Sequence, residues 1–452
     1  YRRNDWKPYA YKTTDFGQSF TRIADEENVS GHALSIVQDP KEDKLLFLGT
    51  ENGLYFSINK GNTWTKWDKD YPSVSTMDLK IQERENDLVI GTYGRAIYIL
   101  DDIRPLRELA TKYNEWPGKE FHVFDYGTAY QMETMAATGV RFRAGGYFSG
   151  DNQRNNAQIK VWIKEPGDPD KRGKEEETKG KSKKSKTDVK EDEKKEQEEK
   201  YDWKDIEVIV KALTGDTLFT YTHKADTGLQ VVNWYLNEKG IRYPSRKKVK
   251  EDAKDPRGPE VFPGKYNLIL NYGTYSDSTI VEVKTDPRTQ YDLAGEKENR
   301  ELMLSFKKTV DLARSAMERL LDAQETMKRV ATRFELAEDS IQDKIKKAGK
   351  KVNDSIVKIQ NLFMQAKGLS GYQDNSKKLN TYLRNAAGHL GSVNGAPTST
   401  TKFAVKKAKE TTDTIVKQIN DFFITKWVEY QKEVLGYEAE IFNEYKVLKR
   451  EE

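Results

Sequence analysis

The chain has 452 residues, of which 36% are apolar and 33% charged, and this length suggests about three domains. Lysine and arginine total 77 and aspartate and glutamate total 73, so the net charge of +4 gives no electrostatic reason to expect nucleic-acid binding. The absence of cysteine excludes disulfides, thiol catalysis and thiolate metal sites. No segment approaches the roughly 18 apolar residues of a membrane-spanning helix, so we expect no membrane span.

A short pattern occurs twice near the start of the sequence: a hydroxyl residue, then an acid or amide, a glycine and an aromatic residue at fixed spacing. The two copies consist of Thr13, Asp15, Gly17 and Phe20, and of Ser57, Asn59, Gly61 and Trp64. Aspartate or asparagine can accept a hydrogen bond from nearby backbone, and glycine tolerates a positive φ. We therefore expect two tight hairpin turns, 44 residues apart from Asp15 to Asn59, each with its aromatic side chain packed inward.

The residues that separate the two patterns are also repeated. Two strand-like stretches recur in the same order, 45–50 then 53–55, and 87–92 then 96–98. Gly49 and Gly91 occupy the same place in the two copies and lie 42 residues apart. Short apolar strands and glycine turns repeated at this period are typical of a β-propeller. The last copy runs into Asp101 and Asp102 without a further turn pattern, so we place the end of the propeller region, 1–105, there.

The two turn patterns resemble the Asp-boxes of bacterial neuraminidase-repeat proteins, a family that includes sialidases and sortilin-type β-propeller proteins. Residues 91–103 (GTYGRAIYILDDI) are similar to the terminal blade of that family. The resemblance implies the C-terminal part of such a protein: its last blades, an immunoglobulin-like sandwich and a helical region. About two blades cannot close a ring that needs at least about four. We therefore expect upstream blades of the same protein, or a cleaved fragment of it, to complete the propeller.

After a linker at 106–118, residues 119–288 have the pattern of a β-sandwich. Strand-like alternation occurs at 140–143, 157–163, 206–210, 228–234, 264–270 and 278–283. Several short strands separated by turns favour an immunoglobulin-like or fibronectin-like sandwich. Within it, residues 164–200 carry mixed charge and almost no apolar side chains, which predicts a disordered insertion.

From residue 295 to 452 the apolar residues follow a helical period. The first apolar stripe consists of Phe306, Val310, Ala313, Met317, Leu320, Met327, Ala331 and Phe334, with Gln324 interrupting it. The second consists of Ile345, Ala348, Val352, Ile356, Ile359 and Phe363. We predict that these helices pack antiparallel, and that a shorter helix at 376–390 and another beginning at 397–398 complete an antiparallel bundle. The aromatic residues Phe422, Phe423, Trp427 and Tyr430 are interpreted as core.

The candidate binding residues of the propeller region are Arg95, Asp101 and Asp102. A sialidase needs an arginine cluster, a tyrosine polarised by a glutamate and an acid aspartate. Four arginines are available in the propeller region, Arg22, Arg95, Arg104 and Arg107, but the spacing places no tyrosine and glutamate together. Adjacent aspartates point to opposite sides of a regular strand, so both cannot serve one site. We favour an ion pair of Arg95 with one of the two aspartates that closes the last blade, with a ligand contact as the alternative.

The four histidines lack metal-ligand spacing, and neither a phosphate-binding loop nor a serine elbow is found, so we assign no catalytic residue, metal or cofactor. We expect a non-catalytic binding or scaffold protein of the bacterial envelope or exterior, with an extracytoplasmic location. Its propeller would present a surface to a protein, peptide or glycan, and an envelope or secretion-complex protein is a further expected partner. The alternative is a glycoside hydrolase, sialidase-like or with two carboxylates, whose active site lies on N-terminal blades outside this sequence.

Overall fold

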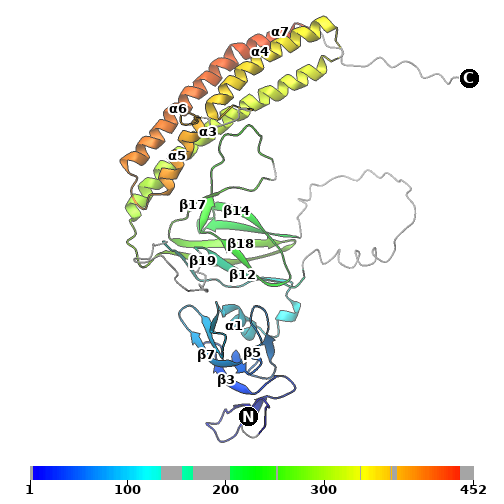
Figure 1. The fold of residues 1–452 in the computed structure, drawn as a ribbon, viewed down its shortest axis with the longest axis vertical. Coiled ribbons are helices and arrows are strands. Elements are labelled where there is room, and N and C mark those ends of the chain that lie inside the picture. Colours follow the sequence, from blue (N-terminus) through cyan, green and yellow to red (C-terminus); the bar gives the residue numbers. More distant parts are fainter. Residues whose placement is uncertain are drawn as a thin grey trace, which may run out of the picture. The chain divides into compact units, whose positions relative to one another are not determined.

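The computed structural model describes residues 4–133, 155–165, 204–250, 253–335, 337–366, 368 and 374–437. Its contacts divide the chain into two compact units. The first comprises residues 1–236 and 262–284, and the second comprises residues 237–261 and 285–452. Antiparallel sheets form the first unit and long helices dominate the second (Figure 1), so the chain is multidomain with a C-terminal helical region.

Three antiparallel sheets follow one another at the start of the first unit. The first two contain β1 (Ala10–Lys12) and β2 (Thr21–Ala24), and then β3 (Ala33–Gln38), β4 (Leu46–Thr50), β5 (Gly53–Ser57) and β6 (Thr65–Trp67). The third contains β7 (Thr76–Gln82), β8 (Asp87–Thr92) and β9 (Ile97–Leu100). The repeated glycines occupy equivalent positions, because Gly49 of β4 pairs with Ser35 of β3 and Gly91 of β8 pairs with Asp78 of β7.

Alternate side chains of β4 enter two different hydrophobic clusters. Leu46 and Leu48 belong to a cluster with Ile23 of the first sheet. Phe47, on the opposite face of the strand, belongs to a cluster with Leu88 of the third sheet. Because successive side chains of a strand point to opposite faces, the middle sheet is buried on both sides. The three sheets are therefore stacked through their apolar faces.

A short helix, α1 (Arg104–Thr111), follows the third sheet and places Leu106 and Ala110 in the same cluster as Leu88. A 3₁₀ turn, η1 (Trp116–Gly118), leads to the remaining strands of this unit. A three-stranded sheet has the order β10 (Phe121–Val123), β12 (Ala157–Ile163) and β15 (Gly228–Trp234). A five-stranded sheet has the order β11 (Thr128–Gln131), β19 (Tyr275–Thr285), β18 (Gly264–Tyr272), β13 (Asp205–Ala212) and β14 (Thr217–Lys224).

The three-stranded and five-stranded sheets contact each other through buried aromatic side chains. Trp234 of β15 is fully buried, and its ring centroid lies 5.5 Å from that of Tyr266 of β18. Alternate residues along β12, β13 and β18 are buried, as their sequence alternation predicts. The predicted strand at 140–143 and nearly all of the predicted insertion at 164–200 lie outside the described residues.

The second unit is built from amphipathic helices. They are α3 (Leu293–Arg333), α4 (Asp339–Phe363), α5 (Leu379–Gly391), α6 (Ser399–Ile424) and α7 (Lys426–Leu435). The residue before α6 acts as the predicted cap, because Thr398 Oγ1 accepts a hydrogen bond from Thr401 N at 3.1 Å. The predicted apolar stripes of α3 and α4 meet in one buried cluster, to which Phe306 and Phe363 both belong.

The helices α3 and α6 run in the same direction. Glu298 of α3 pairs with Lys402 of α6 at 2.7 Å. Further along both helices by the same number of residues, the Arg319 guanidinium lies 5.0 Å from the ring centroid of Phe423. The prediction of a wholly antiparallel bundle is therefore wrong for this pair. The physical reason is α5, which contacts both helices and returns the chain to the start of α3 before α6 begins.

Residues 237–261 belong to the helical unit, although they lie within the range predicted for the sandwich. They contain β16 (Asn237–Lys239) and β17 (Arg257–Glu260), which pair with each other. Arg246 donates a hydrogen bond to Asn361 Oδ1 of α4 at 2.8 Å. These contacts place the segment against the helices, where it forms one wall of the pocket described below.

Candidate functional site

The two repeated turn patterns have the same hydrogen-bond arrangement. In the second copy, Asn59 Oδ1 accepts a hydrogen bond from Thr63 N at 2.9 Å, and Ser57 Oγ accepts one from Gly61 N at 2.9 Å. The corresponding bonds of the first copy are 2.9 and 2.8 Å long. The glycines of the two copies have φ values of 90° and 86°, which glycine adopts without strain. Asp15 and Asn59 therefore act as turn formers.

The aromatic residue that ends each pattern is placed differently in the two copies. Trp64 is 8% exposed and donates a hydrogen bond from Nε1 to the Ile23 carbonyl oxygen at 2.6 Å. Phe20 is 63% exposed, so the predicted inward packing is wrong for this residue. The physical reason is that Trp64 packs on the sheet preceding its own, whereas the described residues offer Phe20 no preceding sheet.

The candidate residue Asp102 lies at the junction between the third sheet and the strands that follow. It lies two residues after the end of β9, and its φ of 54° turns the chain away from the direction of that strand. Its carboxylate accepts hydrogen bonds from Arg104 Nε at 2.5 Å and Nη2 at 3.1 Å, and lies 3.9 Å from Lys160 Nζ of β12. Arg104 also donates to the Tyr126 carbonyl oxygen at 2.7 Å. The Asp102 carboxylate is thus engaged in linking β9 to β12 and to the chain before β11.

The candidate residue Arg95 does not join this junction. It is exposed in the turn between β8 and β9 and forms no ion pair with any residue that the structure describes. The ion pair predicted for Arg95 is made by Arg104 instead. Asp101 lies at the surface with its carboxyl partly covered by neighbouring groups, and this desolvation together with the negative charge of nearby Asp87 raises the pKa of Asp101. The three candidate residues therefore do not converge on one site.

The other arginines of the propeller region are also engaged locally. Arg22 pairs with Glu26 at 2.9 Å, and Arg107 pairs with the buried Asp39 at 2.8 Å. Since Arg104 is held at the junction, these guanidinium groups lie on separate elements and stabilise separate parts of the first unit. Such a distribution does not build the carboxylate-binding arginine cluster of a sialidase.

The two equivalent glycines meet different surroundings. A Cβ atom at Gly49 would collide with Ser35 Oγ of its own sheet and would lie only 2.5 Å from the Thr76 carbonyl oxygen of the third sheet, so a side chain there would force the two sheets apart. A Cβ atom at Gly91 would meet only Asp78 of its own sheet, at the ordinary distance of 3.5 Å. The close approach that requires glycine at position 49 therefore has no counterpart at position 91 among the described residues.

The outer face of the third sheet, on the side of Gly91, carries exposed apolar side chains. Ile97 and Ile99 of β9 are 69% and 59% exposed, and Val89 pairs with Ile99 in the adjacent strand. The equivalent of Ile97 in the second sheet, Leu54, is 1% exposed because the third sheet covers it. We refer to Val89, Gly91, Ile97 and Ile99 as the open face.

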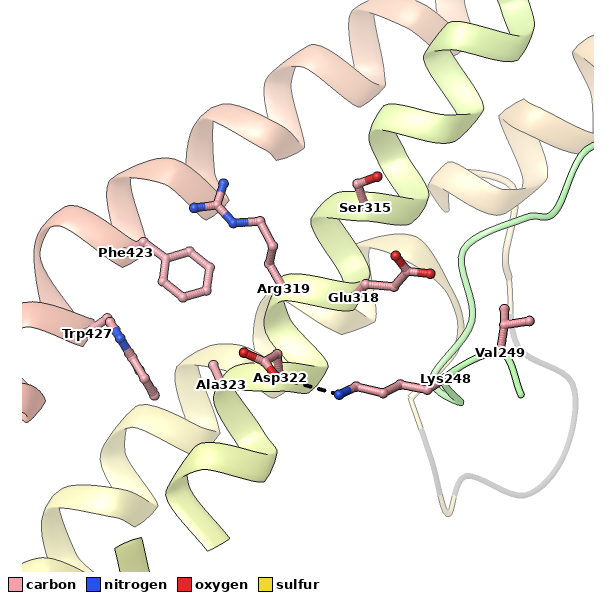
Figure 2. A pocket seen from close by; sticks show the side chains of 9 residues that line it. All are labelled: Lys248, Val249, Ser315, Glu318, Arg319, Asp322, Ala323, Phe423 and Trp427. Atoms are coloured by element: carbon pink, nitrogen blue, oxygen red, sulfur yellow. Dashed lines mark ion pairs between the residues drawn. The ribbon is translucent and has the colours of Figure 1, made fainter. Parts of the chain in front are cut away.

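A pocket of about 640 Å³ lies within the second unit (Figure 2). It is lined by Lys248, Val249, Ser315, Glu318, Arg319, Asp322, Ala323, Phe423 and Trp427. Figure 2 shows the two aromatic side chains on one side of α3 and Lys248 on the other. A volume of this size accommodates a small ligand or several side chains of a partner.

The acidic side chains of the pocket are paired with basic ones. Lys248 Nζ lies 3.6 Å from Asp322 and 2.6 Å from Glu325. Glu318 accepts a hydrogen bond from Arg314 at 2.7 Å, one turn earlier on α3. On the wall of the pocket that faces residues 237–261, both cations are therefore engaged with carboxylates of α3.

The other wall of the pocket combines aromatic rings with an unpaired positive charge. Arg319 forms no ion pair within the described part of the chain, and its guanidinium stacks over Phe423 at 5.0 Å from the ring centroid. The rings of Phe423 and Trp427 are 6.0 Å apart between centroids. Among the described residues, Trp427 Nε1 finds no hydrogen-bond acceptor, although the ring is only partly exposed. This wall therefore offers a guanidinium, an indole N–H and two aromatic faces.

The aromatic residues interpreted as core in the sequence divide into two groups. Phe422 and Tyr430 are 4% and 5% exposed and belong to the core, whereas Phe423 and Trp427 are partly exposed and line the pocket. The aromatic pair is a local signal that the sequence does contain. The opposite wall of the pocket is not predictable from spacing. Its Lys248 lies far from Arg319 in sequence, in a segment that the sequence pattern assigned to a different domain.

Within the described ranges, no three acidic or histidine side chains gather closely enough to hold a metal ion. No helix in that part of the chain is long and apolar enough to cross a membrane. No protein-family model matches the chain, and no curated protein matches it. The resemblance to neuraminidase-repeat proteins rests on the residue patterns themselves.

Proposed function

We propose that this chain is a non-catalytic binding and scaffold protein of the bacterial envelope or exterior, and that its first three sheets belong to consecutive whole and partial blades of a β-propeller. Further blades, from the same protein or a cleaved fragment of it, would pack on the open face and complete the ring. The completed propeller would present a surface to a protein, peptide or glycan. The observation that carries this proposal is the contrast between Gly49 and Gly91.

The sequence keeps glycine at both positions, but only Gly49 has a close neighbour that requires it. Glycine inside a strand weakens the strand unless another backbone approaches closely. Besides Ser35 of its own sheet, the close neighbour of Gly49 is Thr76 of the next sheet in the stack, so the equivalent neighbour of Gly91 would be one further sheet. The exposed Ile97 and Ile99 support the same packing, because they occupy the face that the third sheet covers on its predecessor.

The remaining parts of the chain fit a scaffold. The three-stranded and five-stranded sheets, joined by Trp234 and Tyr266, would form the immunoglobulin-like sandwich that follows the propeller in the sequence. The junction of Asp102, Arg104 and Lys160 would fix the last blade to this sandwich. Three arginines of the propeller region are engaged in local contacts, so the glycoside hydrolase alternative would need its active site on the further blades.

The test is native mass spectrometry of the protein isolated from its natural source, followed by intact mass measurement under denaturing conditions. We expect a second polypeptide, or a chain longer than 52.1 kDa, to supply the further blades. Material that consists of one 52.1 kDa chain alone would contradict the proposal. Hydrolysis of a glycan by the complete assembly would favour the glycosidase alternative.

A pair of glycine variants tests the packing directly. Gly91→Ala should leave the melting temperature of this chain unchanged but abolish its association with the further blades, because the new methyl group occupies their contact surface. Gly49→Ala is the matched control and should lower the melting temperature of the chain itself, because its methyl group collides within the described stack. If the blades belong to one longer chain, Gly91→Ala should lower the melting temperature of that chain. Unchanged association and stability in Gly91→Ala would overturn the assignment.

A further inference from the structure

The wall of the helical pocket formed by Arg319, Phe423 and Trp427 has polar groups that the described protein does not satisfy. We propose that this pocket binds a peptide segment of a partner protein in which an acidic side chain neighbours an aromatic or aliphatic one. The pocket lies wholly within the second unit, so this inference goes beyond the proposed function and does not depend on a completed propeller.

The charge of the ligand follows from the pairing of the pocket residues. Lys248 is held by two carboxylates, and Arg314 is held by Glu318, so neither of these cations is free to bind a ligand carboxylate. Arg319 is the lining side chain whose charge has no counterpart among the described residues. Its guanidinium can form a bidentate hydrogen-bonded pair with a carboxylate. The unused Trp427 N–H provides a second donor on the same wall.

The apolar character of the ligand follows from the aromatic rings. Phe423 holds the guanidinium over its ring by a cation–π contact, which limits the rotamers of Arg319 before any ligand arrives. Phe423 and Trp427 are both only partly covered, so an aromatic or aliphatic side chain can bury itself against them. A carboxylate without an adjacent apolar group would contact Arg319 but leave the rings of Phe423 and Trp427 uncovered.

A peptide fits better than a small molecule because the apolar surface continues beyond the pocket. Leu312, seven residues before Arg319 and so on the same face of α3, is 43% exposed. Val249, on the opposite wall, is 44% exposed. A segment lying along α3 would place its acid on Arg319 and cover these side chains with its own apolar residues.

The test uses the full chain and three fluorescein-labelled synthetic peptides, read by fluorescence anisotropy. The first peptide is rich in glutamate and phenylalanine, the second replaces every glutamate by glutamine, and the third replaces every phenylalanine by serine. We expect measurable binding of the first peptide alone. Arg319→Gln should weaken that binding about tenfold or more through loss of a charge-assisted pair. Arg319→Lys, which keeps the charge but not the planar stack, should restore only part of the affinity.

The matched control is Arg329→Gln, because Arg329 is an exposed arginine of the same helix that does not line the pocket and should leave binding unchanged. Equal binding by wild type and Arg319→Gln, or binding of the glutamine peptide as tight as that of the glutamate peptide, would overturn the proposal. Phenylacetate that binds as tightly as the peptide would reassign the pocket to a small carboxylate.

The chain itself also carries acidic residues near its end, Glu438, Glu440 and Glu444. If replacing these three by glutamine tightens peptide binding tenfold, the occupant is the chain's own segment and not a partner.

Discussion

The guanidinium of Arg107 forms a hydrogen-bonded ion pair with the carboxylate of Asp39, which lies 68 residues earlier in the chain. Arg107 Nε donates to both carboxylate oxygens, at 3.0 and 2.9 Å, and Nη2 donates at 2.8 Å. The side chain of Asp39 is completely buried and that of Arg107 is 11% exposed. Asp39 also accepts hydrogen bonds from the backbone nitrogens of Lys41 and Glu42. This buried pair fixes α1 to the turn that follows β3.

Replacing Asp39 by asparagine should destabilise the first unit strongly. Removing one partner of a buried ion pair leaves the other charge uncompensated, which typically costs about 3–5 kcal/mol. The matched control is Asp43→Asn, whose partner Lys60 is largely exposed, and it should cost about 1 kcal/mol or less. Urea unfolding followed by tryptophan fluorescence measures both. A loss below about 1 kcal/mol for Asp39→Asn would show that the pair does not hold α1.

The two repeated turns allow one hydrogen bond to be tested in two environments. Ser57 Oγ accepts from the buried Gly61 N, whereas the equivalent Thr13 Oγ1 lies in an exposed turn. Ser57→Ala should therefore cost about 1–3 kcal/mol, since it leaves a buried N–H unsatisfied. Thr13→Ala should cost about 0.5 kcal/mol or less, because water replaces the hydroxyl. Equal losses in thermal unfolding would mean that burial does not decide the strength of this bond.

His122 of β10 is held between carboxylates from two other elements. Its Nε2 lies 2.8 Å from Glu108 of α1, and its Nδ1 lies 3.0 Å from Asp277 of β19 and 3.3 Å from Lys119 Nζ. Burial disfavours the charged ring, but the hydrogen bonds to Asp277 and Glu108 outweigh it and raise the pKa of His122 above 6.5. Burial also opposes ionisation of Glu108, yet the bonds from His122 and Lys112 lower the pKa of that carboxyl to about 2.

The stability of the first unit should therefore fall as the pH rises from 6 to 9. A raised folded pKa means that protonated His122 stabilises the fold below 6.5, and that this contribution is lost as the pH passes the folded pKa. Each unit by which the folded pKa exceeds 6.5 is worth about 1.4 kcal/mol. His122→Gln should remove this pH dependence, whereas His389→Gln, at an exposed position of the other unit, should not. An unchanged pH profile in His122→Gln would contradict the prediction.

Gln324, which interrupts the apolar stripe of α3, takes part in a chain of amides between α3 and α4. Gln324 Nε2 donates to Asn353 Oδ1 at 2.8 Å, and Gln324 Oε1 accepts from Gln360 Nε2 at 2.9 Å. Gln360 is 4% exposed. The amides align the two helices by pairing at one position along them, where leucines would permit sliding.

Replacing Gln324 by leucine should cost about 1–3 kcal/mol in the second unit, because the buried Gln360 amide loses its partner. The double variant Gln324→Leu, Gln360→Leu should be more stable than Gln324→Leu alone, since both buried polar groups are then removed. Circular dichroism at increasing urea concentrations measures the helical transition. A neutral or stabilising Gln324→Leu would show that the amide chain contributes nothing to stability.

The helices were predictable because their signals are local. The apolar stripes beginning at Phe306 and Ile345 gave helices that match α3 and α4 closely, and the hydroxyl at Thr398 caps α6 as its position indicates. Helix formation depends on neighbours three and four residues apart, so a short window contains the information. The direction of α6 relative to α3 was not predictable, because it depends on which end of α3 the chain has reached when α5 ends.

The repeated strands and turns were predictable for the same reason, whereas the contacts of individual charged residues were not. Arg95 and Arg104 both lie near Asp102 in sequence, and spacing favours neither as its partner. The choice of Arg104 follows from the positive φ of Asp102, which turns the carboxylate toward α1 and β12. The ion-pair partner of Asp102 depends on one backbone torsion and on a strand that is distant in sequence. Neither of these produces a periodic pattern in the sequence.

The sequence by itself determined the repeat, the turn chemistry and the amphipathic helices of this protein, because each depends on residues close together in the chain. Only the tertiary structure decided which surfaces meet. It placed Thr76 against Gly49 while leaving Gly91 open, and it brought Lys248 and Arg319 to one pocket. Contacts of this kind depend on the packing of whole sheets and helices, in which side chains distant in sequence are selected by shape and burial and not by spacing.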